Sequence, residues 1–292
     1  MKTVIVTGSA AGIGKETAKL FARKGDRVIV ADIDEVGAES TVQEIKAEHG
    51  QAVPYRLDVS SEAQWESFAS WVRTEFGAAD VLVNNAGVMD LGGFVETTPA
   101  QWQRLIDIDL MSVVYGSKVF AQQMIDAGVR GHIVNISSGA AFLPSKLISA
   151  YGVAKAAVLM ATQSLRVEMR QHGIGVTAIC PGAIRTDLLA HGERNGLDDE
   201  RVEEWRADVA TAQAGIAYAG PDKVARAIER AVRRNSAVVP VNAEAWAIYG
   251  LFRLSPGLVR WGTSVASFDR LEGLLERARP VIGRLANRRA NA

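Results

Sequence analysis

Residues 2–14 of the chain read KTVIVTGSAAGIG, a short β-branched run followed by a glycine-rich turn. The run predicts a buried strand over 2–6, and the spacing of apolar residues after the turn predicts a helix over 12–24. Gly8, Gly12 and Gly14 allow a tight turn and let an anion approach the N-terminus of that helix, where unpaired N–H groups favour negative charge. The spacing is GxxxGxG, and a structural connection without a ligand is the alternative interpretation.

The same alternation of strand and helix patterns continues along most of the chain. Strands are expected at 2–6, 27–31, 52–57, 80–83, 131–136, 175–179 and 237–241, and helices near 12–24, 35–49, 61–76, 99–126, 150–172, 187–213 and 221–234. Strands that alternate with helices of this length are typical of βαβ units, whose right-handed crossovers cover both faces of a sheet. The sequence therefore predicts an α/β fold, a Rossmann-type doubly wound parallel sheet of seven strands with helices on both faces.

Composition and charge exclude several classes of protein. The 292 residues include 33 Lys and Arg against 33 Asp and Glu, so the basic surplus of a nucleic-acid-binding protein is absent and no nucleic acid is expected as a partner. The single cysteine, Cys180, excludes an intramolecular disulfide framework, and with no signal-like segment at the start the expected location is cytoplasmic.

The neutral total hides an uneven distribution of charge. Residues 242–292 contain eight arginines and four acidic residues, so that residues 1–241 carry a small acidic surplus. We therefore expect two parts, a catalytic domain over 1–241 and a basic, aromatic helical extension over 242–292, which Pro256 should divide into two helices. The extension has the composition of a helix packed on another subunit or over the mouth of the site, of a helix on a membrane surface, or of a core extension.

An acidic residue follows the second predicted strand. Asp32 lies eighteen residues after Gly14, where a carboxylate accepts hydrogen bonds from ribose hydroxyls and repels a 2′-phosphate. Neither Ala11 nor Ile33 supplies a cation for that phosphate. The expected cofactor is NAD rather than NADP, and the alternative is that Asp32 only caps a turn.

With these motifs the chain resembles the short-chain dehydrogenase/reductase family over residues 1 to about 241. The turn at 7–14 resembles the cofactor loop of that family, Asp58-Val59 its adenine-contacting pair, residues 84–87 (NNAG) its motif after the fourth strand, and Pro181-Gly182 with Ile184 and Thr186 its nicotinamide-side loop. The resemblance implies that NAD is bound by Gly8, Ser9, Ala11, Gly12, Ile13, Gly14, Asp32, Asp58, Val59, Asn85, Ala86, Gly87, Tyr151, Lys155, Pro181, Gly182, Ile184 and Thr186. It also implies a homodimer or homotetramer.

The expected catalytic residues are Ser138, Tyr151 and Lys155. Tyr151 and Lys155 are four residues apart, so on a helix both side chains lie on one face, and Ser138 precedes the tyrosine by thirteen residues. An adjacent ammonium favours the phenolate, which would remove the proton of an alcohol as hydride leaves for NAD⁺. Ser138 would hold the substrate oxygen in line, and Lys155 would bind the nicotinamide ribose if it follows the family.

One position departs from the family pattern. Asp109 stands in the stretch 107–110 (DIDL), where the resemblance leads us to expect a catalytic asparagine that holds a water through its main-chain carbonyl. A carboxylate near Lys155 would stabilise the ammonium and weaken its effect on Tyr151. We therefore expect an active enzyme with a shifted pH optimum.

Substrate contacts are expected from three segments at the carboxyl ends of the strands: Val88–Leu91, Ala141–Pro144 and the insertion from Asp187 to about Gly220, which is long enough to act as a lid. The first two are largely apolar, which favours an apolar secondary alcohol or ketone. The four histidines, including His132, have no ligand-like spacing, so surface or turn positions and no metal are expected. Cys180 is expected to fill space in a buried strand.

The function expected from these features is NAD-dependent hydride transfer to or from a secondary alcohol or ketone. The main alternative is a non-catalytic dinucleotide-sensing or scaffold protein of the same fold, and the presence of Tyr151 and Lys155 argues against it. An epimerase or dehydratase with transient hydride transfer is a further alternative, which would form no net NADH.

Overall fold

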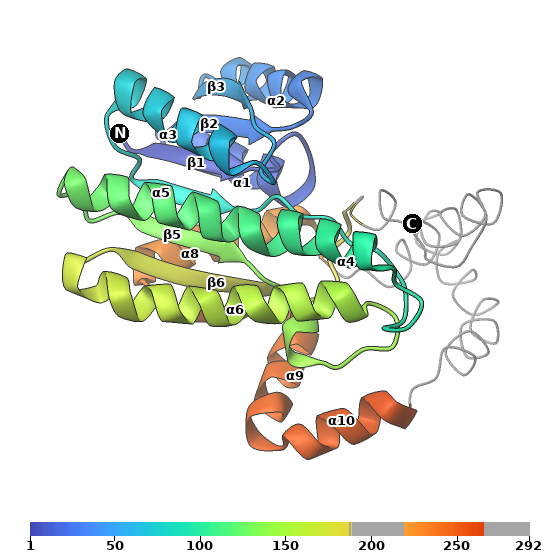
Figure 1. The fold of residues 1–292 in the computed structure, drawn as a ribbon. Helices are drawn as coiled ribbons and strands as arrows, with labels where there is room; N and C mark the ends of the chain where they lie inside the picture. The colour runs from blue at the N-terminus through green and yellow to red at the C-terminus, as the bar shows by residue number, and fades with distance from the viewer. Residues whose placement is uncertain (187, 189–218, 266–292) are drawn as a thin grey trace, which may run out of the picture.

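The computed structural model describes residues 1–186, 188 and 219–265. Within them seven parallel strands form one sheet in the order β3-β2-β1-β4-β5-β6-β7 (Figure 1), which confirms the predicted doubly wound α/β fold. The strands are β1 (Thr3–Thr7), β2 (Arg27–Asp32), β3 (Gln51–Arg56), β4 (Val81–Asn84), β5 (His132–Ile136), β6 (Gly175–Pro181) and β7 (Val238–Val241).

Helices join the strands and cover the sheet. They are α1 (Gly12–Arg23), α2 (Glu35–Ala47), α3 (Glu62–Phe76), α4 (Pro99–Leu105), α5 (Ser112–Asp126), α6 (Ser149–Met169) and α8 (Pro221–Arg234), followed by α9 (Ala243–Leu254) and α10 (Pro256–Val265). Short turns of helix are η1 (Ile106–Met111), η2 (Gly139–Phe142) and η3 (Arg170–His172). The helix expected near 187–213 and most of the insertion from Asp187 lie outside the described residues.

The two faces of the sheet are visible in the first strand. Val4 and Val6 belong to a buried cluster with residues of α1, α2 and α8 on one face, whereas Ile5 packs in a second cluster with residues of α3 and α5 on the other. Successive side chains of a strand point to opposite faces, so both faces of a continuously apolar strand are buried. Figure 1 shows α3, α5 and α6 in front of the sheet.

Both edge strands of the sheet contain a proline. Pro54 lies within β3, and Pro240 lies within β7. Proline has no N–H to donate to a ladder and is therefore found in edge strands rather than in central ones. Each proline leaves its edge strand with one N–H fewer for pairing with a further strand.

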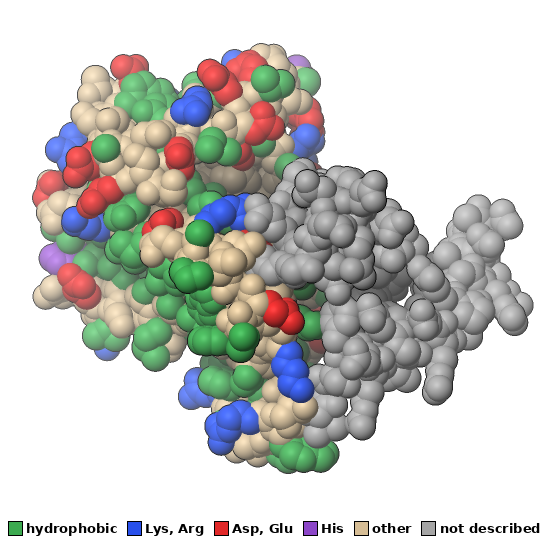
Figure 2. Space-filling model, turned by 45° about the vertical axis from the view of Figure 1, so that its right-hand side comes forward, with side chains coloured by type: hydrophobic (Ala, Val, Ile, Leu, Met, Phe, Trp, Pro, Cys, Tyr) green, Lys and Arg blue, Asp and Glu red, His purple; other side chains and the backbone are tan. Residues whose placement is uncertain are grey.

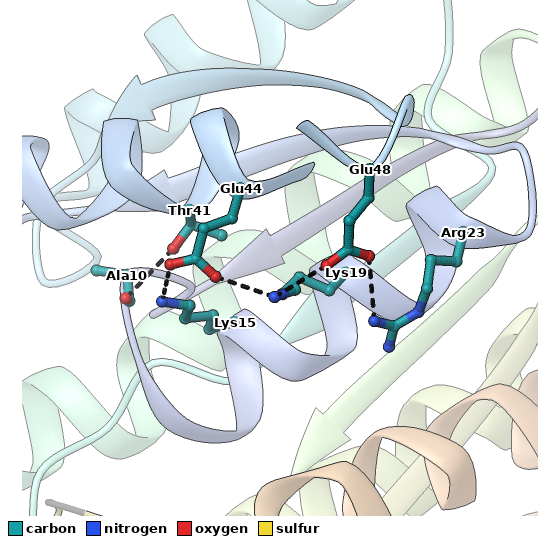
Figure 3. A network of polar contacts seen from close by, with 7 residues as sticks. All are labelled: Ala10, Lys15, Lys19, Arg23, Thr41, Glu44 and Glu48. Carbon is teal, nitrogen blue, oxygen red and sulfur yellow. Dashed lines mark hydrogen bonds and ion pairs between the residues drawn. The ribbon is translucent and has the colours of Figure 1, made fainter. Parts of the chain in front are cut away.

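Ion pairs join α1 to α2 beside the glycine-rich turn (Figure 3). Lys19 of α1 lies between Glu44 and Glu48 of α2, with Nζ–Oε distances of 2.9 and 3.3 Å. Hydrogen bonds from Lys15 and Lys19 lower the pKa of Glu44. The hydroxyl of Thr41 on α2 donates to the carbonyl of Ala10 at 3.3 Å, so that α2 also holds the turn itself.

The predicted helix over 99–126 is interrupted. Residues 106–111 form the wider π-helical turn η1 between α4 and α5, which places one extra residue in the turn. Asp109 lies in this turn with its side chain fully buried. Helical periodicity alone does not distinguish this turn from a regular helix.

The prediction of a surface or turn position is wrong for His132. It begins β5, is 5% exposed, and its Nε2 lies 2.8 Å from the hydroxyl oxygen of Thr177 on β6. Burial, with smaller contributions from Arg166 and Lys2, lowers its pKa to about 4. The neutral imidazole is buried because a hydroxyl on the adjacent strand satisfies one ring nitrogen.

Candidate active site

One large cavity, of about 1000 Å³, opens along the carboxyl ends of the strands. This is the edge of an open α/β sheet where ligands bind, and the volume is at the upper end of the range for small-molecule sites. Most of the residues predicted to bind the cofactor line it: Gly8, Ala11, Gly12, Ile13, Asp32, Asp58, Val59, Asn85, Ala86, Gly87, Tyr151, Lys155, Pro181, Gly182, Ile184 and Thr186.

The glycine-rich turn forms one end of the cavity. Gly8 and Gly12 have φ angles of +63° and +55°, in the left-handed region that favours glycine. A Cβ on Gly8 would lie 2.8 Å from the Cα of Ala86. Helix α1 begins at Gly12 after Ala11, whose side chain provides no cap, so the first N–H groups of the helix remain available to an anion.

Two of the predicted residues support the turn and do not line the cavity. The buried hydroxyl of Ser9 donates to the carbonyl of Val6 at 2.8 Å. A Cβ on Gly14 would lie 2.1 Å from the carbonyl oxygen of Gly8, so this glycine is required by close packing. Their contribution to the site is the shape of the turn.

Asp32, at the end of β2, lines the cavity and also supports the turn. Its carboxylate accepts hydrogen bonds from the backbone N–H of Ala10 at 2.8 Å and of Asp34 at 3.0 Å. Asp34, and not Asp32, caps α2, because its side chain accepts from the N–H of Gly37. The carboxylate of Asp32 is thus held in position at the cavity wall, and four lone-pair directions leave room for further donors.

The residues after β4 are bonded to the glycine-rich turn. The side-chain amide of Asn85 donates to the carbonyls of Thr7 and Gly8 at 2.8 and 3.1 Å, and the N–H groups of Asn85 and Ala86 both donate to the Thr7 hydroxyl at 3.0 Å. The sequence indicated that these motifs belong to one site, and these bonds show how they meet.

Asp58 is both a wall residue and a turn residue. Its Oδ1 accepts from the N–H of Ser60 at 3.0 Å and from the Ser60 hydroxyl at 2.6 Å.

The loop after β6 also lines the cavity and brings Thr186 close to the glycine-rich turn. A Cβ on Gly12 would meet the Thr186 methyl group at 3.6 Å.

Ser138, Tyr151, Lys155 and Asp109 all line the middle of the cavity. Lys155 is buried, and its Nζ lies 3.0 Å from Oδ1 of Asp109, 3.4 Å from the carbonyl oxygen of Ile136 and 5.6 Å from the centre of the Tyr151 ring. Oδ1 of Asp109 also accepts from the N–H of Val88 at 3.1 Å. Oδ2 of Asp109 is buried and has no hydrogen-bond partner among the described residues.

The charges in this cluster act on one another. Burial raises the pKa of Tyr151, Lys155 opposes that effect, Asp109 adds to it, and a hydrogen bond with Ser138 opposes it. Burial alone would lower the pKa of Lys155, but Asp109 and Tyr151 together raise it above its ordinary value. The pKa of Asp109 is raised by burial against the opposing effect of Lys155. Asp109 thus affects Lys155 and Tyr151 in the sense expected from the sequence.

The part of the cavity where the expected substrate segments meet, called the substrate end below, combines predicted and unpredicted elements. Its walls are mainly apolar: Val88, Met89, Leu143, Ile148, Leu188, Ala245 and Ile248, with Ser145 and Glu244 among them. Among the described residues of the predicted segments, Val88, Met89, Leu143 and Leu188 line it, whereas Asp90 forms an ion pair with Arg104.

The contribution of α9 to the wall was one of several alternatives left open by the sequence. The start of α9 is fastened to the loop after β6, since Glu244 accepts from the N–H of Ala183 at 3.2 Å and Asn242 donates to the Ala183 carbonyl at 3.1 Å. Ala245 is fully buried, and Ile248 packs near Phe142 and Cys180. The short side chain of Ala245 permits this close approach, whereas Ala243 and Ala247 are exposed.

Comparison with known proteins agrees with this geometry. A family model described as short chain dehydrogenase matches residues 2–195. The chain belongs to the short-chain dehydrogenase/reductase family. Members of this family are oxidoreductases that use nicotinamide cofactors.

Individual relatives of the family differ in length. A probable oxidoreductase EphD of Mycobacterium tuberculosis is 42% identical over 259 residues, which cover 88% of this chain and 44% of that protein. The chain thus spans less than half the length of the EphD proteins that it matches. A diacetyl reductase ((S)-acetoin forming) of Staphylococcus epidermidis is 34% identical over 202 residues, 69% of this chain and 77% of that protein.

A solved structure has the same fold. A short-chain dehydrogenase/reductase from Burkholderia phymatum in complex with NAD superimposes with a TM-score of 0.78 at 27% identity, covering 87% of this chain and 92% of that one. In the present chain, the open N-terminus of α1 and the glycines of the turn before it provide the cradle that a dinucleotide requires. Among the described residues, no three His, Cys, Asp or Glu side chains come together as a metal site would require.

Proposed function

We propose that the protein is an NAD-dependent oxidoreductase that transfers hydride between nicotinamide and an apolar secondary alcohol or ketone. The observation that supports it best is the convergence of Ser138, Tyr151 and Lys155 in one cavity that also contains the glycine-rich turn. When bound, the dinucleotide supplies the carbon that accepts or donates hydride and a positive charge on its oxidised ring.

The chain's own residues perform the proton chemistry. The hydroxyl of Ser138, which also accepts from the N–H of Ala140 at 3.1 Å, binds the substrate oxygen and orients it. Tyr151 removes the hydroxyl proton in the direction of oxidation and returns it in the direction of reduction. Lys155 stabilises the phenolate through its charge, and Asp109 holds the ammonium at 3.0 Å.

NAD is preferred to NADP in this proposal because of Asp32. Its carboxylate lies at the wall where the adenosine ribose would be bound, and a 2′-phosphate there would meet a negative charge. We expect Asp32→Asn, which keeps an acceptor for Ala10, to lower the preference for NAD over NADP by about tenfold. The ratio of kcat/KM with the two cofactors measures it, and an unchanged ratio would contradict this role.

An apolar substrate follows from the walls of the cavity. The side chains of Met89, Leu143, Ile148 and Ile248 offer burial to hydrocarbon and few hydrogen bonds. The diacetyl reductase relative acts, by its name, on a small ketone. The test is a panel of secondary alcohols of increasing chain length, on which kcat/KM should rise as the alkyl group becomes longer.

The decisive variant is Tyr151→Phe. It removes the proton acceptor and keeps the ring, so we expect kcat for the best alcohol to fall by at least about a hundredfold while NAD binding by titration is unchanged. Tyr115→Phe on α5, outside the cavity, is the matched control. Wild-type protein that binds NAD but oxidises no alcohol would support the sensing or scaffold alternative, and substrate conversion without net NADH would support an epimerase or dehydratase.

Two wider expectations belong to the same proposal. Membership of the family favours a homodimer or homotetramer, which light scattering on the full chain would measure. We propose a cytoplasmic location for the enzyme. Within the described residues no helix is both long and apolar enough to cross a bilayer.

A further inference from the structure

Helices α9 and α10 expose large apolar side chains on the outer side of the molecule. On α9 these are Trp246, Leu251 and Leu254, which recur at helical spacing together with Ala247 and Gly250. Leu254 is 88% exposed and Trp246 54%. On α10 Leu258 and Trp261 lie three residues apart on one face, and Trp261 is 67% exposed. We call these five large residues the outer apolar surface.

The opposite sides of the same helices pack against the domain. Tyr249 and Phe252 contact the ring of Phe142 with centroids 5.0 and 5.9 Å apart, and Val259 of α10 is buried. Both helices are therefore attached to the domain, and detachment is not the cause of the exposure of these side chains. They form a separate face on a helix pair that the core holds in place.

Basic residues flank this surface, and acidic ones are absent from it. Arg253 and Arg260 are exposed, and no Asp or Glu occurs in the sequence between Glu244 and Asp269. Among the described residues neither arginine forms an ion pair; Arg253 donates to the hydroxyl of Tyr249 at 3.0 Å. In Figure 2 hydrophobic and basic side chains lie side by side at the lower end of the molecule.

We propose that the outer apolar surface with Arg253 and Arg260 docks this protein on an anionic lipid surface. Tryptophan and leucine side chains suit the boundary between acyl chains and headgroups, and arginines beside them pair with phosphate groups. The charge pattern argues against a second copy, because a two-fold contact through this face would bring arginines of both copies together without a carboxylate to pair them. The C-terminal segment 266–292 contains six arginines and three acidic residues and is likewise no complement for a basic surface.

The position of the surface relates it to the cavity. Ala245 and Ile248 on the inner side of α9 line the substrate end. At the end of α10, the carbonyl of Ser264 accepts from the Lys146 ammonium at 3.0 Å, and Lys146 belongs to the loop whose neighbours Ser145 and Ile148 also line the cavity. A lipid surface docked on α9 and α10 would therefore lie beside the substrate end of the site.

Flotation of the full chain with vesicles tests the docking surface without any substrate, so its outcome is independent of the proposed function. Binding is expected to vesicles of phosphatidylcholine with phosphatidylglycerol, to be weaker on phosphatidylcholine alone, and to weaken as salt is added. Arg253→Glu with Arg260→Glu should weaken binding by at least about tenfold. Leu254→Ser with Trp261→Ser should also abolish most of it.

Matched controls keep the result specific. Arg73→Glu on α3 and Val36→Ser on α2 change residues of similar exposure elsewhere, and their binding should equal that of the wild type. Equal circular dichroism spectra and equal thermal unfolding midpoints of all variants show that they are folded. The proposal is overturned if the wild type does not float with anionic vesicles, if the two double variants bind like the controls, or if ultracentrifugation shows that these variants dissociate an assembly of copies and the wild type binds no vesicle.

Discussion

At the scale of single residues, the most informative position is Asp109. Its carboxylate contacts the only buried lysine among the described residues, yet one of its oxygens has no partner there. Burial of a carboxylate is costly unless it is paired, so the ammonium of Lys155 is required for the folded arrangement. The same contact offsets part of the positive field that acts on Tyr151.

Asp109→Asn tests this effect on the tyrosine. Because Asp109 raises the pKa of Tyr151, removal of its charge should lower that pKa, and the acid limb of the pH profile for alcohol oxidation should move to lower pH. Asp107→Asn, which changes a half-buried aspartate of the same turn bonded to Gln103, is the control and should leave the profile in place. A profile of Asp109→Asn that coincides with the wild type would mean that the side chain has no such role.

The sequence alone singled out Asp109, but it did not predict the surroundings of that residue. The resemblance placed Asp109 near Lys155 because the family pattern has a polar residue there. The distance of 3.0 Å and the unpartnered oxygen depend on the π-helical turn η1, which the sequence of residues 106–111 (IDIDLM) did not predict. His132 could not be recognised as buried either, because its partner Thr177 is forty-five residues away in the sequence.

At the scale of elements, the turn from β1 to α1 is the most constrained. A Cβ at Gly14 would lie 2.1 Å from the carbonyl oxygen of Gly8 and 2.6 Å from the amide of Asn85. Backbone on one side and a bonded side chain on the other leave no direction in which the contact can relax. Position 14 therefore favours glycine.

Gly14→Ala should therefore weaken NAD binding and lower the free energy of unfolding by about 1–3 kcal/mol. Gly250→Ala on α9 is the matched control, because nothing lies within 4 Å of its Cβ position and alanine favours a helix by up to about 1 kcal/mol. Chemical denaturation and NAD titration measure both. Equal stability and affinity of Gly14→Ala and the wild type would show that the turn can adjust.

Elements were predicted well where one local signal determined them. The strands follow β-branched runs, and α4 begins where Pro99 and the capping pair Thr98 and Gln101 require it. The contact of α9 with the substrate end was less predictable, because it depends on how residues 243–248 meet the loops after β5 and β6. Contacts between segments that are distant in the sequence cannot be predicted from local hydrophobic periodicity.

At the scale of the whole molecule, His132 links stability to pH. Its pKa is about 4 in the folded chain and about 6.5 in an unfolded one, so the unfolded chain binds a proton first as pH falls. The folded state should lose roughly 3 kcal/mol from this group as pH falls from above 6.5 to about 4, and nothing more below that.

His132→Gln should remove this part of the pH dependence, whatever its stability at neutral pH. The measurement is the free energy of unfolding by urea at pH 7 and pH 5, compared between the variant, the wild type and the control His172→Gln, which changes an exposed histidine. The wild type and the control should lose more stability than His132→Gln between the two values. Equal losses would contradict the assignment.

The prolines of the two edge strands also have a consequence for the chain as it is synthesised. β6 is the outermost strand on its side until residues 238–241 add β7, and its residues are buried throughout in the finished fold. Until then its free edge is a template for pairing with another nascent chain. Pairing with β7 ends that exposure, and Pro240 makes the new edge a poorer template, so a chain that ends before Val238 should aggregate more readily.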